Sequence, residues 1–333
     1  MTRPFVIRAC FVVAVSLSLH PVYGQIKQDI DPYRRFGQTE VGQYRVGASI
    51  TASKGAIQNI VAMVAVPLEC EEQTVRIIDE DVTSHCKGID YRMLREGGAR
   101  QLLISIPYLP AGEEAHALIT FEVSTSTILP QEDCSNLQIP VKPDRQLKRY
   151  LGRSPYIETN HTKIKKVARN IFRELAEKEH QQSSEGSESV SDWQRVEAIY
   201  DYVLGHVKYV EGDDKSAVQT LQDGQGDCQN ISALFIAICR TNKIPARIVW
   251  VHEHNYAEFC LQDGEGGLHW FPVESAGTRA FGEMPLARTI LQKGDNFKVP
   301  ERRKALRYAS NFMVAEGLPG SGKPRVRYIQ DQL

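Results

Sequence analysis

The sequence has no excess of charge of either sign, because 40 Lys and Arg residues are balanced by 41 Asp and Glu residues in a chain of 333. Proteins that bind nucleic acid through its phosphates usually carry a basic patch or stripe. No such stripe, with aromatic residues interleaved, is present here, so we expect no nucleic-acid partner. The hydrophobic share of 42% is typical of a soluble protein with a large core, and the length predicts about two domains.

The apolar run near the N-terminus, from Ala9 to Leu19, is too short for a membrane-spanning helix, which needs about 20 residues. Two arginines precede it, and Val22-Tyr23-Gly24 after it offers a cleavage site. This pattern is typical of a secretory signal peptide over residues 1–24. We expect an exported mature chain that begins near Gln25, is secreted or periplasmic, and has no integral membrane segment after cleavage. Left uncleaved, the segment would be a weak membrane anchor.

No two cysteines have the Cys-x-x-Cys spacing that is typical of a structural zinc site. Six cysteines follow the signal peptide, and if Cys228 stays free for chemistry the other five cannot all pair. Cys70 and Cys86 flank a segment that could fold back as a hairpin, so either a disulfide between them or two free thiols fits the sequence. Cys239 and Cys260 lie in apolar segments and are expected to be inert buried thiols.

A helix is predicted to begin at Gly226-Asp227-Cys228, with Asp227 as its N-cap and Cys228 in its first turn. Its buried face recurs at helical spacing through Ile231, Leu234, Phe235 and Ile238. The unpaired N–H groups and the positive dipole end of a helix start favour a thiolate, and they can donate to an oxyanion that forms beside the sulfur. A cysteine there is ambiguous by itself, since most free cysteines are small core hydrophobes.

Three motifs follow this helix in a fixed order. They are Asn242-Lys-Ile-Pro-Ala-Arg247, His254-Asn-Tyr-Ala-Glu258 and Trp270-Phe-Pro-Val-Glu274. The order resembles the transglutaminase-like superfamily of papain-fold cysteine enzymes, whose pattern is Gly-x-Cys on a helix, Gly-Ile-Pro-Ala-Arg, His-x-Trp-x-Glu and Trp-x-Pro-x-Asp. The resemblance implies that Cys228 is the nucleophile and His254 the base.

Two positions depart from the family pattern. Tyr256 stands where the family usually has Trp, and Glu274 stands where it usually has Asp. Glu274 is the predicted third member of the triad, because Trp270, Pro272 and Glu274 share one face of a strand. Glu258 shares a strand face with His254, but we expect it to be a structural partner of Arg247.

The predicted chemistry is attack by a thiolate on the carbonyl carbon of a peptide amide, with His254 protonating the departing amine and Glu274 orienting the imidazole. Water as the second nucleophile gives a peptidase or amidase, and an amine gives a transamidase. The sequence does not choose between hydrolase and acyl transferase. The expected partner is a protein or peptide substrate, and no cofactor or metal is expected. The alternative is a non-catalytic module on the same fold that binds a peptide or cell-wall ligand.

Two assignments within the site stay open. The backbone N–H of Cys228 is one oxyanion donor by position, and Gln222 or Gln225 could supply a second. His252 and His254 would point to the same side of a strand, as two zinc ligands could, but further ligands are missing nearby. We therefore prefer His254 as a base.

The chain divides into segments of different periodicity. From about Gln43 to Val123 apolar and polar residues alternate, with turn residues between the runs, which predicts an antiparallel β-sandwich. Two amphipathic helices are predicted over 164–176 and 192–205, separated by a polar segment at 181–189 that we expect to be a mobile loop. The predicted fold is α+β, with a β-sandwich domain at 25–135, a connector and lead-in helix at 136–190, and a papain-like, transglutaminase-like catalytic domain at 191–333.

Overall fold

The computed structural model describes residues 33–94, 97–182 and 190–333. The predicted signal peptide lies outside this part of the chain, as does most of the polar segment 181–189, so both stay predictions. Within the described ranges, no helix is both long and apolar enough to cross a membrane.

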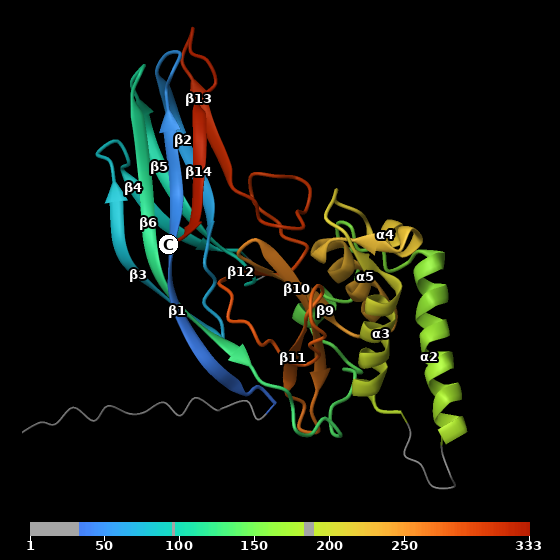
Figure 1. The fold of residues 1–333 in the computed structure, drawn as a ribbon. Coiled ribbons are helices and arrows are strands. Elements are labelled where there is room, and N and C mark those ends of the chain that lie inside the picture. Colours follow the sequence, from blue (N-terminus) through green and yellow to red (C-terminus); the bar gives the residue numbers. More distant parts are fainter. Residues whose placement is uncertain (1–32, 95–96, 183–189) are drawn as a thin grey trace, which may run out of the picture. The chain divides into compact units, whose positions relative to one another are not determined.

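Two four-stranded antiparallel sheets, built from strands near both ends of the described chain, share one core (Figure 1). One sheet has the order β14-β1-β6-β3, from β1 (Phe36–Thr51), β3 (Gln73–Val82), β6 (Glu114–Ile128) and β14 (Arg325–Gln332). The other has the order β13-β2-β5-β4, from β2 (Ile57–Val66), β4 (Gly88–Met93), β5 (Arg100–Leu109) and β13 (Phe312–Gly317). Alternate residues, such as Ile104 and Ile119, are fully buried between the sheets. The predicted β-sandwich is confirmed.

The C-terminal boundary of the catalytic segment differs from the prediction. Residues 191–333 were expected to form one domain, yet β13 and β14 belong to the sandwich, one in each sheet. Val314 pairs with Val61 of β2, and Tyr328 pairs with Ala48 of β1. The returning strands therefore cover sheet edges that would otherwise leave backbone N–H and C=O groups unpaired. Strands that pair across such a long stretch of chain have no local sequence pattern that identifies their partner.

The part of the chain that is predicted to be catalytic, called the catalytic part below, is an antiparallel sheet of order β11-β10-β9-β12 with helices packed on it (Figure 1). Its strands are β9 (Ala246–Val251), β10 (His254–Gln262), β11 (Leu268–Val273) and β12 (Ile290–Lys293), with a small parallel pair of β7 (Lys208–Tyr209) and β8 (Gln225–Gly226). Its helices are α1 (Arg145–Lys148), α2 (Thr162–Gln182), α3 (Asp192–His206), α4 (Ala217–Asp223) and α5 (Cys228–Thr241). The predicted helices over 164–176 and 192–205 are confirmed, and so is the α+β fold class.

The two faces of the catalytic sheet have different neighbours. Side chains alternate along a strand, and on β10 Ala257 and Phe259 join the core beneath α5. Tyr256 lies on the other face, where it packs with Leu68 and Ile290. The strand β10 therefore packs against helix α5 on one face. On the other face it packs against residues such as Leu68, which closely follows a sandwich strand.

The six cysteines of the described chain are all free thiols. Of the two possibilities left open for Cys70 and Cys86, the structure has the two free thiols: Cys70 packs in the cluster of Tyr256, whereas Cys86 packs against the sandwich core and donates to the carbonyl oxygen of His116. The two buried thiols behave as expected. Burial raises the pKa of Cys260 to about 12 and that of Cys239 well above its usual value.

Candidate active site

Cys228 is the first residue of α5, the central helix of the catalytic part. The Asp227 side chain caps this helix, since its carboxylate accepts from the backbone N–H of Asn230 at 2.9 Å, and the predicted N-cap is thus confirmed. Gly226 precedes it in β8, which pairs with β7. A Cβ at Gly226 would lie 2.6 Å from the Cβ of Asn230, so only glycine fits there. The sulfur is held at a rigid junction between a short strand and a helix start.

His254 begins β10 directly after the tight turn from β9, in which Glu253 has a positive φ of 54°. Its Nε2 lies 2.8 Å from Oε1 of Glu274. Burial lowers the pKa of His254, but hydrogen bonds with Cys228 and Glu274 outweigh the burial and raise this pKa to about 9. The imidazole therefore contacts both the sulfur and the carboxylate, and at neutral pH it carries a proton.

Glu274 lies one residue beyond the end of β11, and its carboxylate is almost fully buried, at 6% exposure. Oε1 accepts from His254 and from the backbone N–H groups of Ser275, at 2.8 Å, and Ala276, at 3.2 Å. Oε2 accepts from Nη1 of Arg288 at 3.0 Å. Burial raises the pKa of Glu274, but these donors together hold it below its usual value. The longer side chain is thus folded back onto its own backbone, with one oxygen on the imidazole.

Asn255 is a site residue that sequence reasoning missed. Its Nδ2 donates to Sγ of Cys228 at 3.2 Å, and its side chain is 1% exposed. Its Oδ1 accepts from the hydroxyl of Ser232 at 2.9 Å, and that hydroxyl also contacts the hydroxyl of Ser275. The available signal was weak: Asn255 is a polar residue in an apolar strand, and Ser232 is a polar residue in an apolar helix.

The glutamines predicted as oxyanion donors are placed differently. Gln222 in α4 and Gln225 in β8 are both exposed, and within the described ranges no hydrogen bond joins either side chain to Cys228. Tyr209 of β7 pairs with Gly226 in register and is half-exposed, and partial burial, followed by the neighbouring Cys228, raises the pKa of this tyrosine. The polar group found against the sulfur, besides His254, is the amide of Asn255.

Residues 177–275 match the family model of the transglutaminase-like superfamily, and this span contains all three predicted triad residues. The chain carries a transglutaminase-like domain. No curated protein matches the sequence.

The solved structures that are similar to the chain include the "Putative Cysteine Protease" of Cytophaga hutchinsonii, which is 20% identical, with a TM-score of 0.53 over 89% of this chain and 93% of that chain. That similarity shows a shared fold, from the sandwich through the transglutaminase-like domain. A "putative protease" of Parabacteroides distasonis is 9% identical, with a TM-score of 0.26 over 74% of this chain and 68% of that one. This score is too low to support any conclusion.

Glu258 and His252 lie in the same part of the transglutaminase-like domain but have other partners. Glu258 accepts from Nε of Arg247 at 2.8 Å, which confirms the predicted structural pair. His252 lies in the turn before β10, and its Nδ1 is 3.2 Å from the hydroxyl of Tyr44, so it contacts the sandwich. Within the described part of the chain, no three His, Cys, Asp or Glu side chains are grouped so that they could hold a metal ion.

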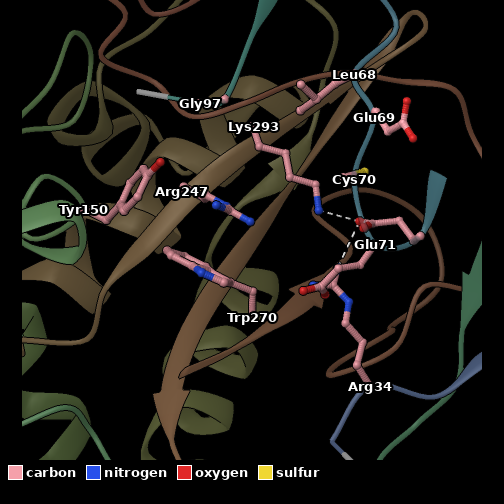
Figure 2. Close-up of a pocket in the computed structure, with 12 residues that line it drawn as sticks. Arg34, Leu68, Glu69, Cys70, Glu71, Gly97, Tyr150, Arg247, Trp270 and Lys293 are labelled. Atoms are coloured by element: carbon pink, nitrogen blue, oxygen red, sulfur yellow. Dashed lines mark hydrogen bonds and ion pairs between the residues drawn. The ribbon is translucent and has the colours of Figure 1, made fainter. Parts of the chain in front are cut away.

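A pocket of about 310 Å³ lies beside the transglutaminase-like domain, but none of the three predicted triad residues lines it (Figure 2). Arg247 and Lys293 reach into it from the catalytic sheet, and Arg247 lies over the ring of Trp270, 3.9 Å from its centroid. Arg34 and Glu72 come from segments that flank the sandwich strands. Lys293 donates to Glu72 and to the buried Glu258, so these ion pairs connect the catalytic sheet with a segment that flanks the sandwich. The pocket is a charged junction, and it is separate from the candidate active site.

Proposed function

We propose that the protein is a cysteine-dependent hydrolase or acyl transferase that acts on peptide amide bonds through Cys228, His254 and Glu274. One observation carries the proposal: a single imidazole contacts both the helix-start sulfur and a buried carboxylate, and these contacts raise its pKa to about 9. A protonated imidazole beside the sulfur favours the thiolate, and the thiolate is the nucleophilic form.

Catalysis begins with a bond from the sulfur of Cys228 to the amide carbonyl carbon, while the π electron pair of the carbonyl moves to oxygen. Collapse of this oxyanion breaks the C–N bond, and the amine leaves with the proton of His254. Nε2 of His254 is held by Glu274, so Nδ1 is the nitrogen that faces the sulfur. Glu274 keeps the ring in this orientation through both transfers.

The second half of the reaction resolves the thioester. The neutral imidazole takes a proton from the incoming nucleophile, which attacks the thioester carbon and releases the thiolate beside an imidazolium. Water gives hydrolysis, and a primary amine gives transamidation. The name of the similar Cytophaga hutchinsonii structure, "Putative Cysteine Protease", supports peptide bonds as substrates and water as the acceptor.

The feature of the sequence that favours the alternative, a non-catalytic binding module, is Glu274 in place of the usual Asp. A carboxylate that could not reach the imidazole would support it. The carboxylate of Glu274 lies 2.8 Å from Nε2, because the extra methylene is taken up by the fold of the side chain onto Ser275 and Ala276. The exchange therefore gives no reason to prefer a binding module.

The test is incubation of the purified protein with a peptide library, with and without an added primary amine, followed by mass spectrometry. We expect cleaved peptides in water and amine adducts when the amine is present, and both should vanish in Cys228→Ser. Cys134→Ser is the matched control, since Cys134 is also a partly buried free thiol. Products that persist in Cys228→Ser would contradict the proposal.

A further inference from the structure

Two neighbouring residues approach the sulfur of Cys228 from different directions. His254 and Asn255 are consecutive in β10, so their side chains leave opposite faces of the strand. The imidazole contacts the sulfur, and the Asn255 amide donates to it at 3.2 Å from the face that packs on α5. The imidazole is needed as a base and an acid. A neutral amide is neither an acid nor a base near pH 7, so its contact with the sulfur calls for another explanation.

In the observed orientation, the amide oxygen of Asn255 is bonded to a chain of hydroxyl groups. A hydroxyl has one proton to give, and Ser232 gives its proton to Oδ1 of Asn255 at 2.9 Å. In the contact between the hydroxyls of Ser232 and Ser275, Ser275 must therefore be the donor. Every donor in this chain points toward the sulfur, and all three side chains are buried. A flipped amide would turn an oxygen lone pair toward the thiolate, which would repel it.

Ser275 joins this chain to the other support of the site. Its hydroxyl begins the chain that ends at the Asn255 amide, and its backbone N–H donates to Oε1 of Glu274 at 2.8 Å. The carboxylate that orients His254 and the amide that contacts Cys228 are thus positioned by the same residue. An amide fixed this firmly meets the main requirement for an oxyanion donor, which is to be in place before charge develops.

We propose that Asn255 is a catalytic residue: its Nδ2 donates to Sγ of Cys228 in the free protein and to the substrate oxyanion once the sulfur has attacked. The inference rests on the proposed function. In the attack the sulfur gives its electron pair to the new C–S bond, and the negative charge passes to the carbonyl oxygen. Sulfur and oxygen are then bonded to the same carbon. The N–H of Asn255 therefore needs to move only a short distance to change its acceptor from the sulfur to the oxyanion. It completes a two-donor site with the backbone N–H of Cys228.

The experiment compares Asn255→Ala with Asn242→Ala in two reactions of the full protein. Asn242 is a matched control, because its amide donates to a backbone oxygen at the opposite end of α5. The first reaction is hydrolysis of a peptide that the unmodified protein cleaves, and the second is labelling of Cys228 by iodoacetamide. Labelling displaces iodide and forms no oxyanion, so it reports on the sulfur alone.

We expect Asn255→Ala to lower kcat by about 100-fold or more, as the loss of one oxyanion donor does, with little change in KM. Labelling of Cys228 should fall far less, and Asn242→Ala should change neither rate. An unchanged kcat, or equal falls in hydrolysis and labelling, would overturn the inference. If the protein cleaves no peptide at all, the proposed function fails with it, whereas cleavage that survives Asn255→Ala overturns the inference alone.

Two further variants keep the result interpretable if Asn255→Ala does not fold. Asn255→Asp keeps the shape and the acceptor for Ser232 but has no N–H, so it should lower kcat at least as much as Asn255→Ala does. Its carboxylate also lies beside the sulfur and disfavours the thiolate, so labelling should fall as well, but by less than kcat. Ser275→Ala removes the hydroxyl and keeps the backbone N–H that holds Glu274. Ser275 is a positioning residue, and its loss should lower kcat less than Asn255→Ala does, with KM and labelling unchanged. Full kcat in Asn255→Asp would contradict the role given to the amide.

Discussion

Oε1 of Glu274 lies 2.8 Å from Nε2 of His254, although Glu274 occupies a position where the transglutaminase-like pattern usually has Asp. The longer side chain reaches no further, because it is bent back toward the N–H groups of Ser275 and Ala276. Arg288 holds the second oxygen at 3.0 Å. The site is thus built around the length of glutamate.

This fit predicts that Glu274→Asp lowers turnover instead of raising it. A carboxylate shortened by one methylene cannot keep His254, Ser275 and Arg288 as partners at once, and a catalytic group displaced by about 1 Å costs about 10-fold or more in rate. Peptide cleavage by the variant measures the effect, with Glu265→Asp at the exposed hairpin tip as a control. A gain in rate would mean that the site merely tolerates Glu274.

The raised pKa of His254 predicts a fall in activity at high pH. The leaving amine needs the imidazolium proton, and this proton is lost as pH rises through about 9. The contribution of the charged imidazole to the stability of the fold also falls as pH rises. It is fully present below the ordinary histidine pKa of about 6.5 and is lost as pH rises toward 9.

Both effects can be measured on one protein. The pH profile of kcat should bend downward near pH 9, and the free energy of unfolding should decline between about pH 6.5 and 9 more in the unmodified protein than in His254→Gln. A kcat that stays level to pH 10 would contradict the role of His254 as the acid.

The buried charges at the junction of sandwich and catalytic sheet predict a large effect on stability. Lys293 bonds to Glu258 at 3.0 Å and to Glu72, and all three side chains are buried. Lys293→Met leaves both carboxylates with fewer partners, and breaking a buried ion pair in this way costs about 3 to 5 kcal/mol. Urea unfolding measures the loss, with the exposed Lys298→Met as a control. Equal free energies of unfolding for the two variants would show that the ion pairs of Lys293 do not contribute to stability.

The N-terminal pattern predicts export. In its host the mature chain should begin near Gln25 and be found outside the cytoplasm, because the charged start, short apolar run and small-residue site are those of a signal peptide. N-terminal sequencing of the protein recovered from the cell exterior tests this. An intact Met1 on that protein would contradict it.

The parts of the fold that the sequence predicts well are set by neighbours along the chain. The helix start at Asp227 and Cys228 follows from a cap residue and an apolar period, and the pair of Glu258 with Arg247 follows from a hairpin between adjacent strands. Asn255 could not be predicted, because its role depends on contacts with Ser232 and Cys228 that only tertiary packing creates.

The same distinction explains the errors. The C-terminal strands β13 and β14 were expected to belong to the catalytic part, but a strand pattern does not say which sheet the strand joins. The sequence could not choose between a disulfide and two free thiols at Cys70 and Cys86 for a related reason. A hairpin would place the two residues opposite each other, whereas Cys70 turns toward the catalytic sheet and Cys86 toward the sandwich core.

The central claim is that Cys228 is a nucleophile activated by His254, and its most direct test is brief labelling with iodoacetamide at pH 7, read residue by residue by mass spectrometry. The account predicts that Cys228 is labelled before the other five free cysteines of the described chain, and that His254→Ala slows its labelling by about 10-fold or more. Earlier labelling of Cys70, Cys86 or Cys134, or an equal rate at Cys228 in His254→Ala, would contradict it.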